Sequence, residues 1–200
     1  MSRVGIISPG AMGTTLAKSL IDSGHQVFWA SDFRSQTTKQ NANSIDMVDL
    51  QDTEKLFATC NFVFCIGRNG WGHPDRENIA GAHAQQAVDL NFEGIYVDFN
   101  GLEEDDIEFL NHIIKKSNVK YVEAALRGWP HTINMQVPEP GTISYDLYEP
   151  RTMFLAGEYA SDVESLFSDE VWVVKICETS PKSIVLGIAK NQPPVERIEN

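Results

Sequence analysis

Residues 3–35 decide the fold of this chain, and they read RVGIISPGAMGTTLAKSLIDSGHQVFWASDFRS. Residues 4–7 form a short apolar run of the kind that makes a buried parallel strand, and residues 27–30 form a second one. Between them, apolar side chains recur at helical spacing from Leu16 onward. A strand, a glycine-containing turn, a helix and a second strand make up the first unit of a dinucleotide-binding fold.

The turn of this unit has the sequence Ser8-Pro9-Gly10-Ala11-Met12-Gly13. Gly10 lets the backbone approach a diphosphate that a Cβ would obstruct, and Gly13 lets the helix pack closely on the strand. The free N–H groups and the dipole of the helix start favour an anion. Ser8 replaces the first glycine of the usual G-x-G-x-x-G pattern, and Pro9 predicts an extended Ser8. We expect these six residues to bind the cofactor; a turn that binds nothing is the alternative.

The end of the second strand is expected to contact the adenosine ribose. An acidic residue there accepts hydrogen bonds from the 2′-OH of NAD, whereas an arginine suits the 2′-phosphate of NADP. Asp32 argues for NAD, while Arg34 with Ser31 and Ser35 argues for NADP. We include all four residues in the cofactor site. NADP or NAD is the expected cofactor, and we favour NADP because an arginine between serines makes a phosphate-binding nest.

Composition predicts an ordinary globular protein without affinity for nucleic acid. The chain has 200 residues, of which 42% are hydrophobic and 22% charged. This length suits a single domain over residues 1–200, with core βα units at 1–126 and a sheet extension and terminal helix at 127–200. The net charge of −12 argues against nucleic-acid partners, because neutralising phosphates requires a basic surface.

Targeting and metal signals are absent from the sequence. No signal peptide is visible, and no apolar stretch approaches the roughly 18 residues of a membrane helix. Cys60, Cys65 and Cys177 lack disulfide or zinc spacing, so we expect free thiols, no metal site and a cytoplasmic location.

Strand and helix signals alternate along most of the chain. Further strands are expected at residues 45–48, 62–66, 95–98, 119–126, 142–148, 152–156 and 171–176. Helices are expected at residues 37–43, 52–58, 74–88, 102–117, 161–167 and 180–190. The pattern predicts an α/β fold: a Rossmann-like, doubly wound, mostly parallel sheet, with additional mixed or antiparallel strands on the C-terminal side.

Several short motifs carry a family resemblance. They are Ile7-Ser8-Pro9-Gly10-Ala11-Met12-Gly13, Gly24-His25-Gln26-Val27, Trp29-Ala30-Ser31 with Arg34-Ser35, Tyr96-Val97-Asp98-Phe99-Asn100, Tyr121-Val122-Glu123-Ala124 and Met153-Phe154-Leu155-Ala156-Gly157. With them the chain resembles the phosphogluconate dehydrogenase and β-hydroxyacid dehydrogenase superfamily, and more narrowly its phosphogluconate-dehydrogenase-like NAD-binding proteins. The motifs occur in family order and cover nearly the whole chain.

The resemblance implies a cofactor domain with hydride-transfer ancestry. Such enzymes usually continue into a helical domain that dimerises and closes the active site, so a homodimer or a partner subunit is expected to replace it here. Their catalytic lysine lies in the helix after the last strand. Our alignment places Leu186 at that position, with Lys182 and Lys190 about one turn away, and Lys182 is our candidate. The family's glycine-rich substrate loop departs from its usual small residues at 126–130.

Polar residues at the carboxyl ends of the predicted strands complete the candidate site, because ligands bind there in open α/β sheets. Ile66 ends the fourth strand, Gly67 and Arg68 follow it, and all three are assigned to the cofactor. Asn100 follows the fifth strand and is assigned to cofactor and catalysis; a structural turn asparagine is the alternative. Arg127 and His131 follow the sixth strand and are catalytic candidates with Lys182.

The strand-end arginines suggest a cationic pocket, since guanidinium groups bind phosphate or carboxylate bidentately; pairing with acidic loop residues is the alternative. His131 has the pKa range of a general acid or base, although a surface histidine is the plainer interpretation. Two functions remain open. One is an NAD(P)-dependent oxidoreductase acting on a small polar, anionic substrate. The other is a non-catalytic NAD(P)-binding module that senses cofactor or supports a partner enzyme.

Overall fold

A computed structural model describes residues 1–66, 76–100, 104–128, 151–168 and 172–185. The strands are β1 (Arg3–Ile7), β2 (Gln26–Trp29), β3 (Val48–Asp49), β4 (Phe62–Cys65), β5 (Ile95–Asp98), β6 (Lys120–Arg127), β7 (Thr152–Ala156) and β8 (Val173–Ile176). The helices are α1 (Ala11–Asp22), α2 (Gln36–Asn43), α3 (Thr53–Thr59), α4 (Arg76–Asp89), α5 (Glu104–Lys115) and α7 (Ala160–Glu164). Residues 181–185 are also helical.

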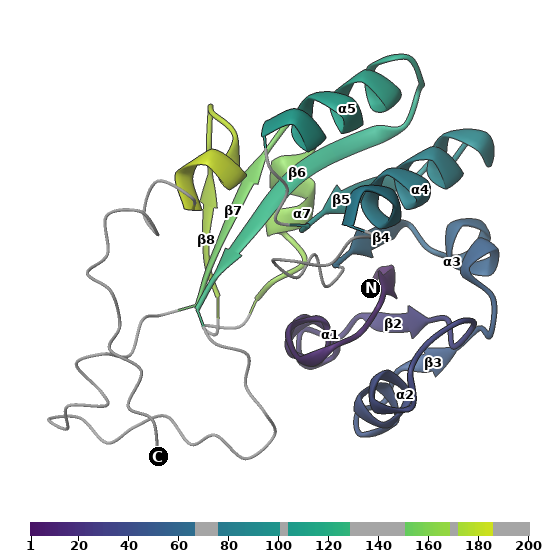
Figure 1. Ribbon diagram of the computed structural model, residues 1–200. Coiled ribbons are helices and arrows are strands. Elements are labelled where there is room, and N and C mark those ends of the chain that lie inside the picture. The colour runs from purple at the N-terminus through teal and green to yellow at the C-terminus, as the bar shows by residue number, and fades with distance from the viewer. Residues whose placement is uncertain (67–75, 101–103, 129–150, 169–171, 186–200) are drawn as a thin grey trace, which may run out of the picture.

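The strands form one sheet in the order β3-β2-β1-β4-β5-β6-β7-β8 (Figure 1). Neighbouring strands run parallel except β6 and β7, which pair antiparallel. The chain moves outward from β1 to β3 and then returns to place β4 on the other side of β1, so the strand order reverses between β1 and β4. This is a Rossmann-like arrangement, and it confirms the predicted fold class, including the antiparallel extension.

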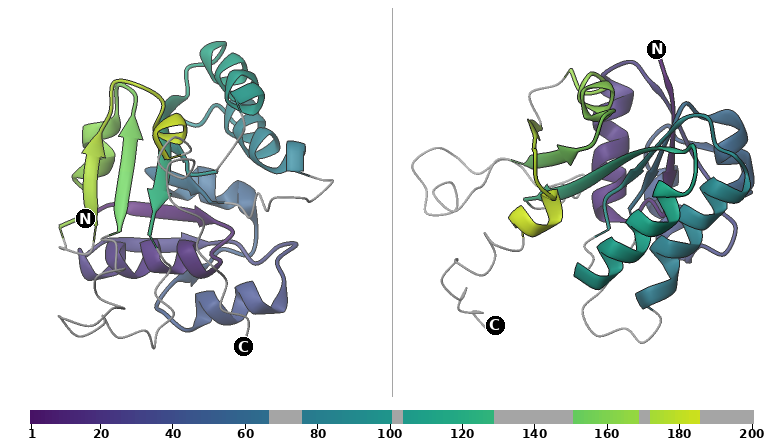
Figure 2. Two further views of the ribbon diagram at one scale, coloured as in Figure 1. Left: turned by 60° about the vertical axis from the view of Figure 1, so that its left-hand side comes forward. Right: turned by 90° about the horizontal axis from the view of Figure 1, so that it is seen from above.

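Helices cover both faces of the sheet (Figure 2). The apolar residues of α1 and α7 pack into one buried cluster with β1, β4 and β7. The apolar residues of α3, α4 and α5 pack into a second cluster with the other sides of β1, β4 and β5. Each central strand is therefore buried on both faces, which explains why residues 4–7 and 62–66 are continuous apolar runs.

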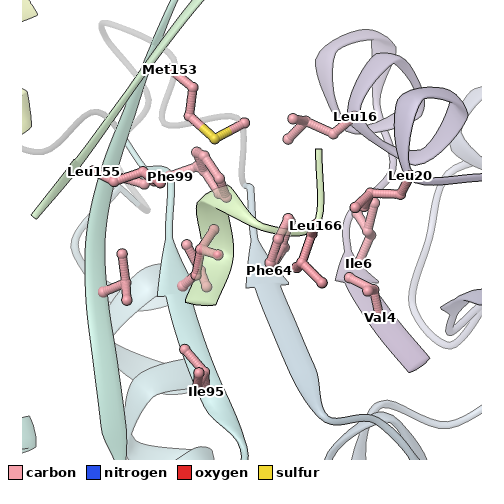
Figure 3. Close-up of a cluster of buried hydrophobic side chains, with 14 of the residues drawn as sticks. Val4, Ile6, Leu16, Leu20, Phe64, Ile95, Phe99, Met153, Leu155 and Leu166 are labelled. Carbon is pink, nitrogen blue, oxygen red and sulfur yellow. The ribbon is translucent and has the colours of Figure 1, made fainter. Parts of the chain in front are cut away.

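The larger cluster joins the first and last parts of the chain (Figure 3). Leu16 and Leu20 of α1 lie opposite Met153 of β7, with the aromatic rings of Phe64 and Phe99 between them, 5.3 Å apart at their centroids. Each such side chain contributes about 1.5–3 kcal/mol when fully buried.

Two hydrogen bonds reinforce this long-range packing. The indole Nε1–H of Trp172 donates to the Ser19 hydroxyl oxygen over 3.1 Å, and the backbone N–H of Ser168 donates to the Ser23 hydroxyl oxygen over 3.2 Å. The segment around β8 is thereby fixed directly to α1.

The element boundaries differ from the sequence expectations in a few places. The strand expected at 45–48 is reduced to Val48–Asp49, because Ile45 and Met47 pack against the core cluster ahead of it. The helix expected at 161–167 is α7, and it ends at Glu164. The strand expected at 142–148, the first turn of the helix expected from Pro74, and residues 186–190 lie outside the described residues.

The cysteines match the sequence expectation for free thiols. Cys60 and Cys65 are buried and Cys177 is partly exposed, and none of the three forms a disulfide. In the parts of the chain that the structure describes, no helix has the length and apolar character needed to cross a membrane.

Candidate functional site

The turn between β1 and α1 leaves the helix start open. Gly10 occupies the N-cap position of α1, and no side chain of the described residues caps the helix there. A Cβ added at Gly10 would meet no atom within 4 Å. The space above Gly10 is therefore open, and the first N–H groups of α1 have no side-chain cap among the described residues, at the point where the strand order reverses; such groups bind anions.

Gly13 serves the close packing that its position predicts. An added Cβ there would lie 3.2 Å from the Ile66 side chain and 3.2 Å from the carbonyl oxygen of Ser8. Within the turn, Pro9 is buried, Met12 is partly buried against the core and Ala11 is exposed.

The conformation predicted for Ser8 is wrong. Its φ of 63° lies in the left-handed region that favours glycine, not in the extended region. The turn reverses sharply here, and the N–H of Gly10 donates to the Ser8 carbonyl oxygen over 2.7 Å. Pro9 favours extended backbone at its neighbour, and the tight turn closed by this hydrogen bond overrides that preference.

The residues that follow β2 differ in the contacts that they already make within the protein. The Asp32 carboxylate accepts hydrogen bonds from the backbone N–H and the hydroxyl of Thr53, over 3.2 and 2.9 Å. Ser35 caps α2 through a bond from the Thr38 N–H. Phe33 is fully exposed and has a φ of 54°. Asp32, the residue expected to bind a ribose hydroxyl, thus fixes the start of α3.

Arg34 turns back across the carboxyl end of β1. Its Nη1 donates to the Ser8 hydroxyl oxygen over 2.6 Å. Its Nε–H is buried and has no hydrogen-bond partner. Burial is the main cause that lowers the pKa of His83 on α4, and the charge of Arg34 adds to that lowering. Through its contact with Ser8, Arg34 lies at the carboxyl end of β1, beside which β4 pairs.

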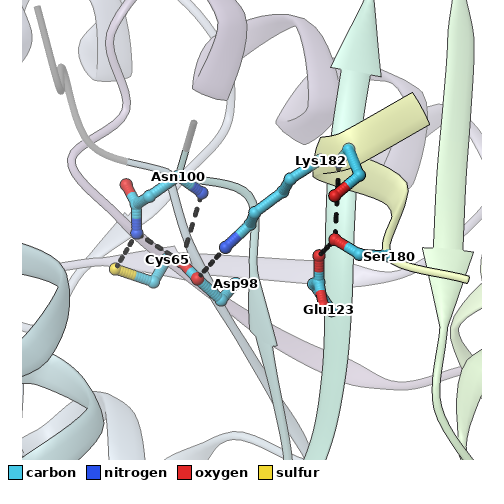
Figure 4. A network of polar contacts seen from close by, with 7 residues as sticks. Cys65, Asp98, Asn100, Glu123, Ser180 and Lys182 are labelled. Carbon is cyan, nitrogen blue, oxygen red and sulfur yellow. Dashed lines mark hydrogen bonds and ion pairs between the residues drawn. The ribbon is translucent and has the colours of Figure 1, made fainter. Parts of the chain in front are cut away.

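A buried ion pair lies at the carboxyl end of β5 (Figure 4). Lys182 reaches from the helical residues after β8 to Asp98, with Nζ and carboxylate oxygen 2.5 Å apart and both side chains no more than 1% exposed. Asn100 donates to the same carboxylate from its backbone N–H and its side chain. Its side-chain amide also contacts the Cys65 sulfur at 3.3 Å. Burial raises the pKa of the Cys65 thiol to about 11, and the negative charge of Asp98 adds to the shift.

A second carboxylate stands beside this pair. Glu123 of β6 is the register partner of Asp98, and it accepts a hydrogen bond from the hydroxyl of Ser180. Ser180 directly precedes the helical turn that carries Lys182. The two contacts together attach this turn to the end of β5 and the middle of β6 (Figure 4).

The structure brings together some of the predicted site residues. Ser8 and Arg34 are in contact, as are Asn100 and Lys182 through Asp98. Arg127 ends β6, where its register partner is Thr152 of β7. The backbone N–H of Ser31 donates a hydrogen bond to the Asp49 carboxylate. Gly67, Arg68, His131, Leu186 and Lys190 lie outside the described residues.

Sequence reasoning missed four residues that organise the site: Thr53, Asp98, Glu123 and Ser180. Two of them carried a usable signal. Asp98 and Glu123 each follow an aromatic and a valine within an apolar strand, and a charged residue inside a buried strand is rare unless it is paired. The remaining two depend on contacts across the fold that the local sequence does not announce.

A pocket of about 600 Å³ opens at the opposite edge of the sheet. It is lined by residues of α3, the α4–β5 turn and the starts of β4 and β6, among them Phe57, Asn61 and Lys120. It does not include the residues of the turn or the ion pair. Within the described ranges, no cluster of three or more metal-binding side chains occurs.

The sequence matches no described protein family and no curated protein. The fold, however, recurs in solved structures that include dehydrogenases and reductases. One is a conserved protein of unknown function described as structurally similar to 3-hydroxyacid dehydrogenases, with 19% identity, a TM-score of 0.62, and coverage of 90% of this chain and 59% of its own. Another is an imine reductase from a Pseudomonas species, with 17% identity, a TM-score of 0.65, and coverage of 94% and 60%.

A third is a reductive aminase from Aspergillus terreus, solved with NADPH and ethyl levulinate, with 13% identity, a TM-score of 0.61, and coverage of 95% and 59%. At these identities the likeness shows the fold alone. The expected resemblance to hydroxyacid dehydrogenases is confirmed at that level. This chain spans about 60% of the length of these proteins.

Proposed function

We propose that this chain binds NAD(P) at the turn after β1 and acts as the cofactor domain of an oxidoreductase. One observation carries the proposal. The uncapped start of α1 faces open space above Gly10, at the place where the strand order reverses and ligands of open α/β sheets bind. The dehydrogenases and reductases that share the fold support the same reaction class.

The residues present fit an NADP molecule better than an NAD molecule. The amides at the start of α1 would hold the diphosphate. Arg34 has no carboxylate partner among the described residues, which suits the 2′-phosphate. Asp32, which an NAD site would use for the ribose, is already engaged by Thr53. The NADPH in the reductive aminase structure agrees with this preference.

The substrate side of the proposal rests on the ends of β5 and β6. The nicotinamide, when bound, supplies or accepts the hydride. Lys182 would hold the proton that is exchanged with a small polar substrate, and Asn100 would orient the reacting groups. Arg127 would bind an anionic group of the substrate at the end of β6.

We further propose that a second copy of the chain or a partner subunit closes the site. A closed site excludes water, which strengthens the electrostatic interactions within it. The reducing cytoplasm is the compartment we propose, because it keeps the buried Cys60 and Cys65 as thiols. Light scattering at increasing concentration tests the assembly: a mass of one chain throughout excludes self-association.

Nucleotide binding is tested by thermal unfolding with NAD, NADH, NADP and NADPH. A nucleotide at a hundred times its Kd should add about 2.7 kcal/mol to the free energy of unfolding. The matched variant is Gly10→Ala. Its new methyl meets no protein atom, so stability should hold, but it obstructs the diphosphate, and affinity should fall at least tenfold. No shift with any of the four nucleotides refutes the proposal.

Turnover separates the enzyme from a protein that only binds the nucleotide. NADPH oxidation is followed with a panel of oxo acids, aldehydes and imines, for the native chain and for Lys182→Met. Activity that disappears in the variant while NADPH binding is retained supports the role of Lys182. Binding without oxidation of NADPH by any substrate of the panel identifies the non-catalytic module instead.

A further inference from the structure

We propose that Ser8, acting through Arg34, sets the preference of this site for nucleotides that carry a 2′-phosphate. The inference rests on the nucleotide binding proposed above and adds a positioning residue within the phosphate-binding turn. Ser8 occupies the position of the first glycine in the usual motif. A glycine at this position contributes only its backbone, whereas Ser8 also contributes a side chain.

The contact itself is direct. The Nη1–H of Arg34 donates to the Ser8 hydroxyl oxygen over 2.6 Å, and 26 residues separate the two in sequence. Because a guanidinium only donates, the Ser8 oxygen must accept, and the hydroxyl hydrogen is left to donate to another group. The pair therefore presents donors and no carboxylate, which is the chemistry that binds a phosphate.

The backbone of Ser8 indicates that the side chain matters. A φ of 63° is strained for serine and unstrained for glycine, which would form this turn at lower cost. Glycine has no hydroxyl, so it would leave Arg34 without this acceptor. Strained residues persist where the surrounding structure fixes them, and they concentrate at functional sites.

No carboxylate of the described residues neutralises the charge of Arg34, so the guanidinium is available to an anionic ligand. Asp32 is the nearest acidic residue in sequence, and its carboxylate points to Thr53. Among the described residues, no carboxylate forms an ion pair with Arg34, and its buried Nε–H has no hydrogen-bond partner. A ligand phosphate would supply the counter-charge that the guanidinium lacks.

Holding the guanidinium on Ser8 also lowers the cost of binding. A free arginine side chain loses rotamer entropy when a ligand fixes it, and that loss weakens affinity. Ser8 fixes Arg34 before the ligand arrives. Arg34 follows β2, whose end contacts the adenosine ribose in this fold, so binding of the 2′-phosphate would benefit from the fixed guanidinium. The diphosphate, which NAD and NADP share, is the alternative ligand group for Arg34.

A double-mutant cycle tests the proposal, with Ser8→Gly, Arg34→Ala and the double variant. Dissociation constants are measured by calorimetry for NADPH and NADH, and for 2′,5′-ADP and ADP as fragments without nicotinamide. Ser8→Gly should weaken NADPH and 2′,5′-ADP about fivefold to tenfold, the size of one hydrogen bond. Arg34→Ala should weaken them about 10- to 100-fold, the size of a charged one. NADH and ADP should change little.

The decisive result is the coupling between the two residues. In the Arg34→Ala background, Ser8→Gly should have no further effect on NADPH. The thermal stability of Ser8→Gly should not fall, because glycine relieves the strained φ. The proposal is overturned if Ser8→Gly weakens NADPH equally in both backgrounds. It is overturned equally if NADH and ADP weaken as much as NADPH, since the pair then serves the diphosphate. A native chain that binds none of the four ligands refutes the proposed function itself.

Discussion

The two halves of the sheet's carboxyl edge are built on opposite principles. At the ends of β1 and β2, the helix start is uncapped and Arg34 keeps a buried donor without a partner. At the end of β5 and along β6, by contrast, Asp98 neutralises the charge of Lys182, and Glu123 accepts a hydrogen bond from Ser180. The open half keeps donors without partners among the described residues, as the proposed nucleotide site requires, whereas the closed half pairs its charges and holds the proposed catalytic lysine in place.

Removal of Asp98 should cause the largest loss of stability, because it disrupts the buried ion pair of the closed half. Asp98→Ala leaves the ammonium of Lys182 buried without a counter-charge, and we expect about 3–5 kcal/mol less free energy of unfolding in urea titrations. The double variant Asp98→Leu with Lys182→Met removes both charges and should recover most of that loss. If the double variant is no more stable than Asp98→Ala, the ion pair is not what stabilises this half.

The buried thiol beneath the closed half predicts a pH dependence of stability. Burial raises the pKa of Cys65 to about 11, so between pH 9 and 11 the folded protein keeps a proton that the unfolded chain releases. Stability contributed by this thiol is complete below pH 9 and falls as pH rises through 11, by up to about 3 kcal/mol. Urea titrations across this range should show a smaller decline for Cys65→Ala. Equal declines would exclude the thiol as the cause.

A methyl group distinguishes the two glycines of the open half. Gly13→Ala places Cβ 3.2 Å from the Ser8 carbonyl, which cannot yield easily, and we expect about 2 kcal/mol of destabilisation. Gly10→Ala is the control, since its methyl meets open space and its cost should appear in ligand binding alone. Thermal unfolding without ligand checks the pair; equal melting temperatures would contradict the packing role of Gly13.

The smallest expected effect concerns Asp32, whose carboxylate already accepts hydrogen bonds from Thr53. Thr53→Val removes the hydroxyl that donates to Asp32 but keeps the shape and the backbone N–H bond, so about 1 kcal/mol of stability should be lost. The freed lone pairs should also let Asp32 accept a ribose hydroxyl, which narrows the NADPH-to-NADH affinity ratio. A ratio that does not change would mean that Asp32 lies away from the ribose.

Local sequence predicted the elements well and their side-chain contacts poorly. Residues 4–7 could be assigned to a buried strand, and Gly13 to close packing, because each depends on neighbours in sequence or on one helix. The pairing of Lys182 with Asp98 spans 84 residues, so no local pattern encodes it. The Ser8 conformation was missed for a different reason. The proline rule predicts extended backbone, and the tight turn between Ser8 and Gly10 overrides it.

The hydrogen bond from Trp172 to Ser19 has a consequence for the order of folding. During synthesis, α1 emerges early, but the indole that completes its cover is made 153 residues later. Contacts of such long range slow folding, since a long loop must close before they form. We therefore expect the nascent amino-terminal unit to expose apolar surface until Trp172 and β8 have been synthesised. Chaperones bind such exposed apolar surface, so we expect them to bind this unit.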